Sequence, residues 1–281
     1  MIAVFTALYP EAEPLLLELR RRGIQMKRLP SGSLTAWRSK DDRYMLAVTG
    51  SGEIAAAIAT AQLLTQFPAD FAVNFGTAAG SDPAASCFRI CKITEETTGR
   101  DFYPGMVWAA PFAERALVTV PHPAAAPAGT ASPSLPCLTD MEGAGFFQAA
   151  ARFLSTDKIV LLKAVSDAGE TAALTPDRLR AVCAAVAAGV TDCLTGLSEA
   201  VDAYRAEEET KEEPALMAKA EADLNGSEAM RRRLHRILCW QALSGEDMGK
   251  LVRKLYEDGS LPAGSKKKGK EVLEQLERDI L

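Results

Sequence analysis

The sequence predicts an α/β domain followed by a smaller helical part, and two patterns support this. Residues 2–8, 71–75 and 158–165 form near-continuous apolar runs, which are typical of strands buried on both faces of a sheet. The segments between them carry apolar residues at helical spacing, as residues 10–22 do. This alternation indicates a sheet with helices packed on it.

Composition favours a soluble, cytoplasmic protein. The chain has 281 residues, 48% of them apolar, which is enough for a sizeable core and an appendage. Its formal net charge of −5 gives no general attraction to nucleic acid or to an anionic membrane. The apolar N-terminus lacks a basic segment and runs into Glu11 and Glu13, which predicts a strand rather than a signal peptide. No uninterrupted apolar stretch approaches the roughly 18 residues of a membrane helix.

The cysteines and histidines narrow the chemistry. Six cysteines lie in apolar segments without a matched C-x-x-C pair, so we expect buried thiols in a reducing compartment, no metal site and no cofactor. The chain has only two histidines, His122 and His235. A Ser-His-Asp or Cys-His mechanism is therefore disfavoured, and any catalysis should rest mainly on carboxylates.

The first predicted strand leads directly into a helix. Pro10 fits the first helical position, Glu11 and Glu13 enrich the first turn, and Gly23 ends the pattern. Glu11 thus follows the carboxyl end of a strand, which is the edge where open α/β sheets bind ligands. A role limited to complementing the helix dipole fits Glu11 equally well.

Residues 34–38 and 44–49 predict a hairpin, and the next helix opens with Gly50-Ser51-Gly52. With Ala55 this turn matches G-x-G-x-x-A, and Asp70 lies roughly where a dinucleotide-binding acid would be. That fingerprint usually belongs to the first βα unit of a domain, whereas this one follows a hairpin. The motif alone leaves dinucleotide binding open.

Small residues at positions 76–80 follow the strand of residues 71–75 and allow the backbone to approach a ligand or a neighbouring element closely. Residues 94–105 predict a loop that mixes charges with aromatics, and a substrate lid and an oligomer contact both fit it. The Pro- and Ala-rich residues 121–136 predict a surface loop.

Two further acids are expected at strand ends. Glu142 lies where a short strand turns into a helix, near the positive end of the helix dipole, which suits it to accept hydrogen bonds from ligand hydroxyls. A simple capping role for Asp140 or Glu142 is at least as well supported by this pattern. Asp167 follows the buried strand of residues 158–165.

We divide the chain into a domain of residues 1–205, a charged linker or helix extension of residues 206–228, and a helical tail of residues 229–281. The tail carries two basic clusters, at residues 231–236 and 266–270. Solvated helix faces and a flexible loop are the favoured interpretation of these clusters, and nucleic-acid contact is the alternative.

Several segments taken together resemble the purine nucleoside phosphorylase and nucleosidase superfamily, in particular its methylthioadenosine/S-adenosylhomocysteine nucleosidase branch. They are Ala7-Leu8-Tyr9-Pro10-Glu11, Thr49-Gly50-Ser51-Gly52, Asn74-Phe75-Gly76-Thr77-Ala78-Ala79-Gly80, Asp140-Met141-Glu142-Gly143-Ala144 and Val165-Ser166-Asp167. The resemblance covers roughly residues 1–200. It implies a three-layer α/β/α fold around a mixed, partly barrel-like sheet, with the helical tail as an appendage. It also assigns Gly50 and Gly52 to the family's own turn, which removes the dinucleotide interpretation.

The resemblance implies a nucleosidase that hydrolyses the N-glycosidic bond of a purine nucleoside, with or without a 5′ substituent. Carried over position by position, Glu142 binds the ribose 2′ and 3′ hydroxyls and Met141 packs against the sugar. Asp167, supported by Ser166, protonates or hydrogen-bonds N7 of the leaving base. An oxocarbenium-like transition state needs such an acid on one side and a polarised water on the other.

Glu11 is implied to hold and activate the attacking water, with Gly76 and Thr77 lining the pocket. The superfamily's phosphorylases carry a phosphate-binding arginine where this chain has Asn74, so water is the expected nucleophile. A phosphate-dependent phosphorylase and a catalytically degenerate nucleoside-binding module are the alternatives.

One region departs from the family pattern. Between Tyr103 and Asp140 the chain is shorter, and the Pro/Ala-rich loop replaces the segment that supplies an aromatic ring against the base. Phe102, Tyr103 or Phe112 is expected to stand in for that ring. The resemblance also implies a homodimer.

Overall fold

The computed structural model of the chain describes residues 1–30, 34–123, 136–169, 174–210, 213–243 and 248–280. The chain divides into two compact units, Met1–Asp202 and Ala203–Leu281. Each unit has its own apolar core. Most of the predicted surface loop at residues 121–136 lies outside the described residues.

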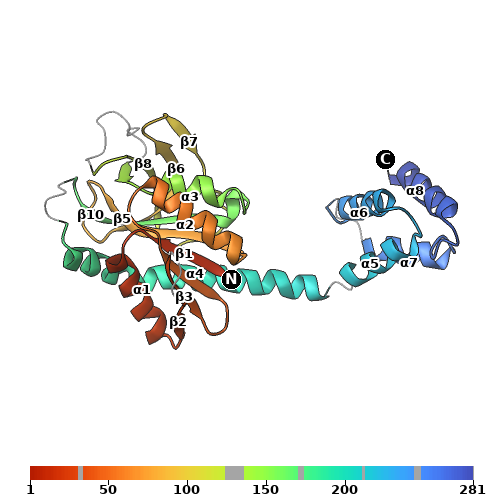
Figure 1. Cartoon of the computed structure of the whole chain (residues 1–281), viewed down its shortest axis with the longest axis horizontal. Helices are drawn as coiled ribbons and strands as arrows, with labels where there is room; N and C mark the ends of the chain where they lie inside the picture. Colours follow the sequence, from red (N-terminus) through yellow and green to blue (C-terminus); the bar gives the residue numbers. More distant parts are fainter. Residues whose placement is uncertain (31–33, 124–135, 170–173, 211–212, 244–247, 281) are drawn as a thin grey trace. The chain divides into compact units, whose positions relative to one another are not determined.

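Among the described residues, ten strands form one mixed sheet in the first unit (Figure 1). The strands are β1 (Ile2–Thr6), β2 (Met26–Arg28), β3 (Thr35–Ser39), β4 (Tyr44–Val48), β5 (Phe71–Ala79), β6 (Cys87–Glu95), β7 (Arg100–Phe102), β8 (Ala113–Thr119), β9 (Cys137–Asp140) and β10 (Ile159–Asp167). Their order is β10-β6-β8-β9-β5-β1-β4-β3-β2, with β7 paired to β6. Because β10 also pairs with β5, the first five strands of that order close into a barrel. The expected partly barrel-like sheet is confirmed.

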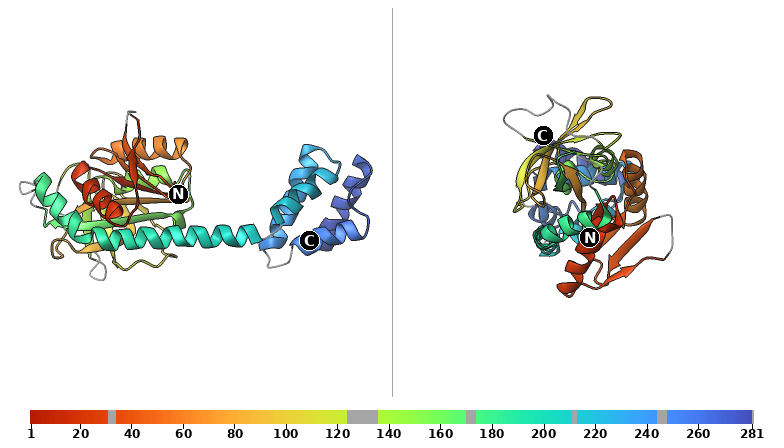
Figure 2. Two further views of the ribbon diagram at one scale, coloured as in Figure 1. Left: turned by 90° about the horizontal axis from the view of Figure 1, so that it is seen from below. Right: turned by 90° about the vertical axis from the view of Figure 1, so that its left-hand side faces the viewer.

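Helices cover both faces of the sheet. They are α1 (Tyr9–Arg21), α2 (Glu53–Gln66), α3 (Gly143–Ala150) and α4 (Pro176–Thr210). Leu63 of α2 and Phe146 of α3 pack into one apolar cluster, whereas Leu15 of α1 and Val190 of α4 pack into the other. Figure 2 shows α2 and α4 on opposite sides of the strands. The three-layer α/β/α fold is therefore confirmed.

The apolar runs became the central strands because both of their faces are covered. Every residue of β1 and of β10 is buried. Strand β5 lies between these two strands and is parallel to both, so the three strands end at one edge of the sheet. This edge brings together the segments after residues 6, 76 and 166.

The structure differs from the sequence prediction at two short segments. Residues 94–105 are not a simple loop, because β6 continues to Glu95 and pairs with β7 as an antiparallel hairpin. Strand β2 was not predicted, since it has three residues and pairs along one side of the predicted hairpin. Within the described residues, the Pro176–Arg205 part of α4 is the one helix long and apolar enough to cross a membrane by length and composition. Its inward side chains pack in the core, as expected of a core helix.

The second unit is a group of helices: α5 (Glu213–Asp223), α6 (Glu228–Leu243), α7 (Met248–Glu257) and α8 (Lys266–Ile280). Buried leucines such as Leu234, Leu238 and Leu273 form its core. Residues 266–268 were expected in a flexible loop, and that was wrong, because they form the first turn of α8. A Cβ on Gly269 would lie 2.1 Å from the carbonyl oxygen of Leu224, so a glycine is needed for the close contact that seats α8.

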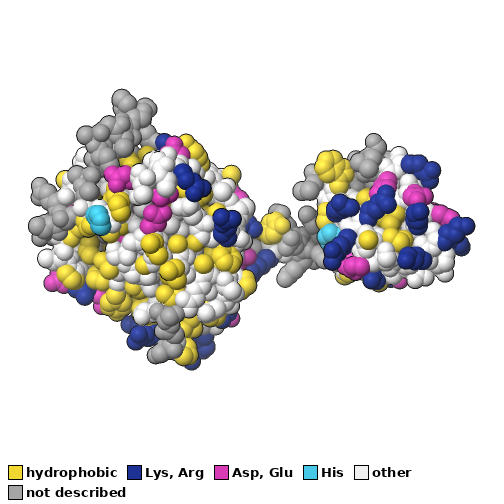
Figure 3. All heavy atoms as spheres, turned by 45° about the horizontal axis from the view of Figure 1, so that its top comes forward, with side chains coloured by type: hydrophobic (Ala, Val, Ile, Leu, Met, Phe, Trp, Pro, Cys, Tyr) yellow, Lys and Arg dark blue, Asp and Glu magenta, His cyan; other side chains and the backbone are white. Residues whose placement is uncertain are grey.

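The basic residues of this unit are dispersed among acids. Figure 3 shows Lys and Arg side chains interspersed with Asp and Glu on the visible face of the unit. Arg232 pairs with Glu228, and Arg233 pairs with Glu277. These contacts support solvated helix faces over nucleic-acid contact.

Candidate active site

The three predicted acids line one pocket at the carboxyl edge of the sheet. The pocket has a volume of about 260 Å³ and is lined by Glu11, Glu142 and Asp167. Among the other predicted residues, Met141, Thr77 and Ser166 line it as well. The remaining described lining residues are Ala7, Leu8, Ser51, Ala78, Ala79, Val120, Pro123, Thr139, Asp140, Leu174 and Leu179.

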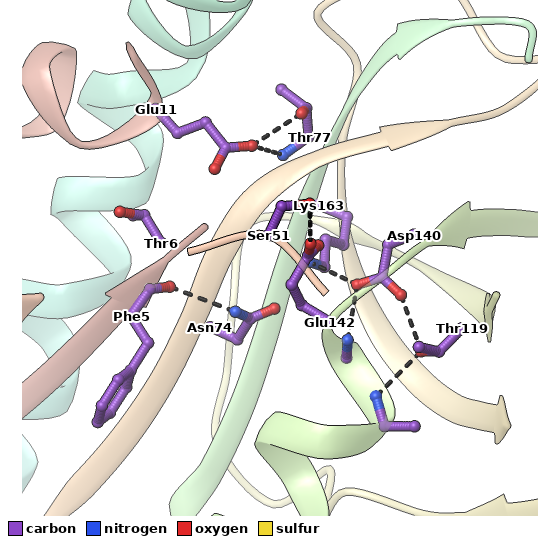
Figure 4. Close-up of polar contacts among 12 residues, drawn as sticks. Phe5, Thr6, Glu11, Ser51, Asn74, Thr77, Thr119, Asp140, Glu142 and Lys163 are labelled. Carbon is purple, nitrogen blue, oxygen red and sulfur yellow. Dashed lines mark hydrogen bonds and ion pairs between the residues drawn. The ribbon is translucent and has the colours of Figure 1, made fainter. Parts of the chain in front are cut away.

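Glu11 both caps its helix and faces the pocket, so the two roles proposed for it are compatible. Its Oε2 accepts a hydrogen bond from the backbone N–H of Leu8 at 2.9 Å, which ties the first turn of α1. Its Oε1 accepts from the N–H and the Oγ1–H of Thr77, each at 2.8 Å (Figure 4). A carboxylate offers about four acceptor positions, so these three bonds leave about one for a water or a ligand hydroxyl. The side chain is fixed and can still take a ligand.

Gly76 does not line the pocket but makes room for Glu11. A Cβ at this position would lie 3.1 Å from Oε1 of Glu11. The small residue predicted to allow a close approach is thus explained by the carboxylate of a neighbouring element rather than by a direct ligand contact.

Capping of α3 is carried by Asp140, which frees Glu142 for another role. Asp140 Oδ2 accepts from the N–H of Gly143 at 2.8 Å, and Thr119 Oγ1 accepts from the N–H of Ala144 at 3.0 Å. Thr119 in turn donates to Asp140 Oδ1 at 2.8 Å. Glu142 occupies the N-cap position but makes no capping hydrogen bond with its side chain.

Glu142 is instead held by the turn that precedes α2. Its Oε1 accepts from Ser51 Oγ at 3.1 Å and from the N–H of Gly52 at 2.8 Å. Gly52 adopts φ +100°, a left-handed conformation that favours glycine. Both bonds end on Oε1, which leaves the lone pairs of Oε2 for a ligand. Burial and the neighbouring Asp140 raise the pKa of Glu142, and Lys163 opposes this rise.

The glycine motif therefore serves a carboxylate and not a dinucleotide. Asp70, which stood in for the ribose-binding acid of that fingerprint, instead pairs with the terminal ammonium of Met1. Ser51 was not predicted as a site residue. The two glycines that flank it, Gly50 and Gly52, were the available signal in the sequence. Both adopt a positive φ in the structure, which explains why the turn contains glycines.

Lys163 is the second residue that the sequence did not assign to the site. Its Nζ lies 2.8 Å from Asp140 Oδ2, and the side chain is almost fully buried (Figure 4). Burial disfavours the ammonium, but the negative fields of Asp140 and Glu142 outweigh it and raise the pKa of Lys163. The sequence could not show this partner, because Asp140 lies on β9 and Lys163 on β10.

Asp167 is oriented by an irregularity at the end of β10. The register between β10 and β5 shifts between Val165 and Asp167. Such a bulge re-aims a side chain at the end of a strand. Asp167 Oδ2 then accepts from Ser166 Oγ at 2.6 Å and Oδ1 accepts from the N–H of Gly169 at 2.7 Å. The predicted support of Asp167 by Ser166 is present.

The aromatic residues expected on the base side are not brought to the pocket. Phe102 packs against Phe147 with ring centroids 5.6 Å apart, and Tyr103 is 60% exposed. Phe112 packs in the cluster beneath α4, next to Gly189. The described residues that line the pocket include no aromatic ring. Val120 and Pro123 supply apolar surface there instead.

Positive charge is scarce around the pocket. None of its described lining residues is a lysine, arginine or histidine. Asn74 is buried and donates to the carbonyl oxygen of Phe5 at 3.3 Å. Arg38 pairs with Asp42. In the part of the chain that the structure describes, no group of three or more His, Cys, Asp or Glu side chains is arranged to hold a metal ion.

Comparison with known proteins finds similar structures but no similar sequence. No protein-family model and no curated protein matches the chain in sequence. Among solved structures, a methylthioadenosine/S-adenosylhomocysteine nucleosidase mutant from Helicobacter pylori, with 5′-methylthioadenosine in its active site, has a TM-score of 0.58 at 12% identity, covering 69% of this chain and 97% of that one.

Two further structures agree. The corresponding nucleosidase from Neisseria meningitidis, in complex with methylthio-immucillin-A, has a TM-score of 0.56 at 21% identity, covering 69% of this chain and 98% of that one. Futalosine hydrolase from Helicobacter pylori has a TM-score of 0.55 at 12% identity, covering 69% and 97%. The chain thus has the fold that these nucleosidase and futalosine hydrolase structures share.

Proposed function

We propose that the first unit is a nucleosidase that hydrolyses the N-glycosidic bond of a purine nucleoside. The observation that carries this proposal is the convergence of Glu11, Glu142 and Asp167 on one pocket, each held by hydrogen bonds from the protein. Fixed carboxylates suit a reaction that develops positive charge on the sugar ring.

In the proposed reaction Asp167 acts as the general acid and donates a proton to N7 of the base. The C1′–N9 bond breaks and its electron pair leaves with the base, so positive charge develops at C1′ and the ring oxygen. Water held by Glu11 attacks C1′ and gives a proton to the Glu11 carboxylate. The products are the free base and a ribose with a hydroxyl at C1′.

The ribose is proposed to lie over Glu142. Oε2 of Glu142 can accept from the 2′ and 3′ hydroxyls, since the bonds from Ser51 and Gly52 occupy Oε1. Met141 lines the pocket beside it and offers apolar surface to the sugar. A carboxylate that accepts from both hydroxyls of the diol would discriminate against deoxyribosides.

The charge balance of the pocket favours water over phosphate as the nucleophile. The carboxyl groups of Glu11, Glu142 and Asp167 line it, and no cationic side chain is among its described lining residues. A phosphate dianion would meet like charge there without the bidentate cation that usually binds it. The same argument disfavours substrates with a 5′ phosphate.

The substrate is proposed to carry an uncharged 5′ group. One similar solved structure, the nucleosidase mutant from Helicobacter pylori, holds 5′-methylthioadenosine, whose 5′ methylthio group is uncharged. Leu8, Leu174 and Leu179 supply apolar surface in the pocket of this chain, which suits an apolar substituent. A homodimer belongs to the proposal through the family resemblance, and a cytoplasmic location belongs to it through the pattern of cysteines in the sequence.

A panel of purine nucleosides with varied bases and 5′ groups, incubated with and without phosphate, tests the proposal. We expect release of free base at the same rate in both conditions. Release that requires phosphate would identify a phosphorylase instead. Binding of nucleosides without any release would identify a non-catalytic module.

A further inference from the structure

Lys163 occupies a position where an apolar residue would be expected. Leu161 and Val165, two residues before and after it on β10, belong to the apolar core. Lys163 pairs in the sheet with Gly76 of β5 and Phe88 of β6, so it lies between two strands inside the barrel. Its side chain is only 2% exposed, and that of its partner Asp140 is not exposed at all.

Stability does not explain such an ion pair. Removing two charges from water is costly, and apolar replacements for a buried pair are often neutral or stabilising. The cap on Gly143 also needs only an oxygen at position 140, which an asparagine would supply. A function for the ammonium behind the wall of the pocket is the remaining explanation.

The surroundings of Glu142 indicate that function. Asp140 on β9 and Glu11 on α1 face it with negative charge, and Lys163 on β10 faces it with positive charge. Glu53, in the first turn of α2, adds a further acid beside Asp140. Without a cation, this group of carboxyls would take up a proton instead of carrying several negative charges at close range.

We infer that Lys163 is a positioning residue for the reaction proposed above, holding the Asp140 carboxylate at the start of α3 and keeping Glu142 ionised to accept the ribose hydroxyls. Lys163 acts through Asp140 and through its field, and it does not need to touch the substrate. The inference rests on the proposed function for its meaning in catalysis. Its electrostatic content can be measured separately.

Opposite charge deletions should have opposite effects, which a merely structural role would not produce. Lys163→Met should move the acid limb of the pH profile of kcat/KM upward by about 1–3 pH units. Asp140→Asn should move that limb downward, because it removes a negative neighbour of Glu142 and keeps the ammonium. The acid limb of the double variant, Asp140→Asn with Lys163→Met, should lie close to that of the wild type. Lys163→Arg keeps the positive charge, so its acid limb should match that of the wild type.

Lys92→Met is the matched control. Lys92 pairs with Asp101 at 2.9 Å, close to the 2.8 Å of the buried pair, but its side chain is 35% exposed. The same substitution there should leave the pH profile unchanged. If Lys163→Met fails to fold, the downward shift of Asp140→Asn and the wild-type limb of the double variant still carry the test.

An isotope-edited infrared titration separates this inference from the proposed function. The carboxyl band of Glu142 is assigned by its loss in Glu142→Gln. This band should show that Glu142 takes up its proton at higher pH in Lys163→Met than in the wild type. The shift does not depend on whether the protein cleaves nucleosides. Absence of base release by the wild type would overturn the proposed function alone. An unshifted Glu142 band in both single-charge variants would overturn the role of Lys163.

Discussion

Replacing Asp167 with asparagine removes the proposed acid with little change to its surroundings. The amide oxygen can still accept from the N–H of Gly169, which lies 2.7 Å from Oδ1 in the wild type. Ser166 Oγ also lies 3.4 Å from the carbonyl oxygen of Ala78, so its proton has a second acceptor when the carboxylate is lost. We therefore expect Asp167→Asn to fold normally.

The loss of activity should be that of a general acid. Such groups contribute about 10²- to 10⁴-fold, so kcat for a purine nucleoside should fall by that factor. The factor corresponds to about 2.7–5.4 kcal/mol of transition-state stabilisation. For a nucleoside methylated at N7, kcat should fall much less in Asp167→Asn, because the methylated base leaves without a proton from the protein. Base release monitored by ultraviolet absorbance measures both substrates.

Asp177→Asn provides a control for the Asp-to-Asn change, since the side chain of Asp177 is 92% exposed at the start of α4. It should retain wild-type kcat. Cleavage of ordinary purine nucleosides by Asp167→Asn within tenfold of the wild type would refute the role of Asp167 as acid. Equal losses on ordinary and N7-methylated substrates would indicate that Asp167 acts in some other way.

Two further substitutions test the other carboxylates. Thr77→Val removes the hydroxyl that donates to Glu11 at 2.8 Å and keeps the side-chain shape. A hydrogen bond to a charged group contributes about 1.5–3 kcal/mol, so kcat should fall about 10- to 150-fold; an unchanged kcat would show that this bond does not help to activate the water. Glu142→Gln should weaken nucleoside binding, measured by calorimetry, yet raise Tm at pH 7. Burial raises the pKa of Glu142, so the folded state binds this proton more tightly, and stability falls as pH rises above the unfolded value of about 4.3. Glutamine avoids that cost, so the gain in Tm should vanish below about pH 4, and a lower Tm at pH 7 would contradict this assignment.

Much of the fold follows from local signals in the sequence. The runs that became β1 and β10 are apolar on both faces, because helices cover the sheet on each side. The closing pair between β5 and β10 joins residues far apart in the chain, and only the family resemblance implied a barrel. Residues 229–281 were predicted to be helical, but the first turn of α8 was expected in a loop because its three lysines and a glycine obscure the apolar period.

Part of the candidate site could also be predicted from local signals in the sequence. Glu11, Glu142 and Asp167 could be placed at the ligand-binding edge because each lies at or soon after the end of a strand, and the family resemblance supplied their roles. Which acid caps α3 could not be decided locally, since the answer depends on Thr119 from a neighbouring strand. The partner of Lys163 was hidden for the same reason, because β9 and β10 follow one another in the chain but are not adjacent in the sheet.

The most direct test of the central claim is product analysis in the presence of saturating phosphate. The wild-type protein is incubated with a 5′-substituted purine nucleoside, and the sugar product is followed by phosphorus-31 NMR while base release is followed by ultraviolet absorbance. We predict stoichiometric free base and a free reducing sugar, with no new phosphorus resonance. Formation of a sugar 1-phosphate, or no release of base from any nucleoside, would contradict a hydrolase built on Glu11, Glu142 and Asp167.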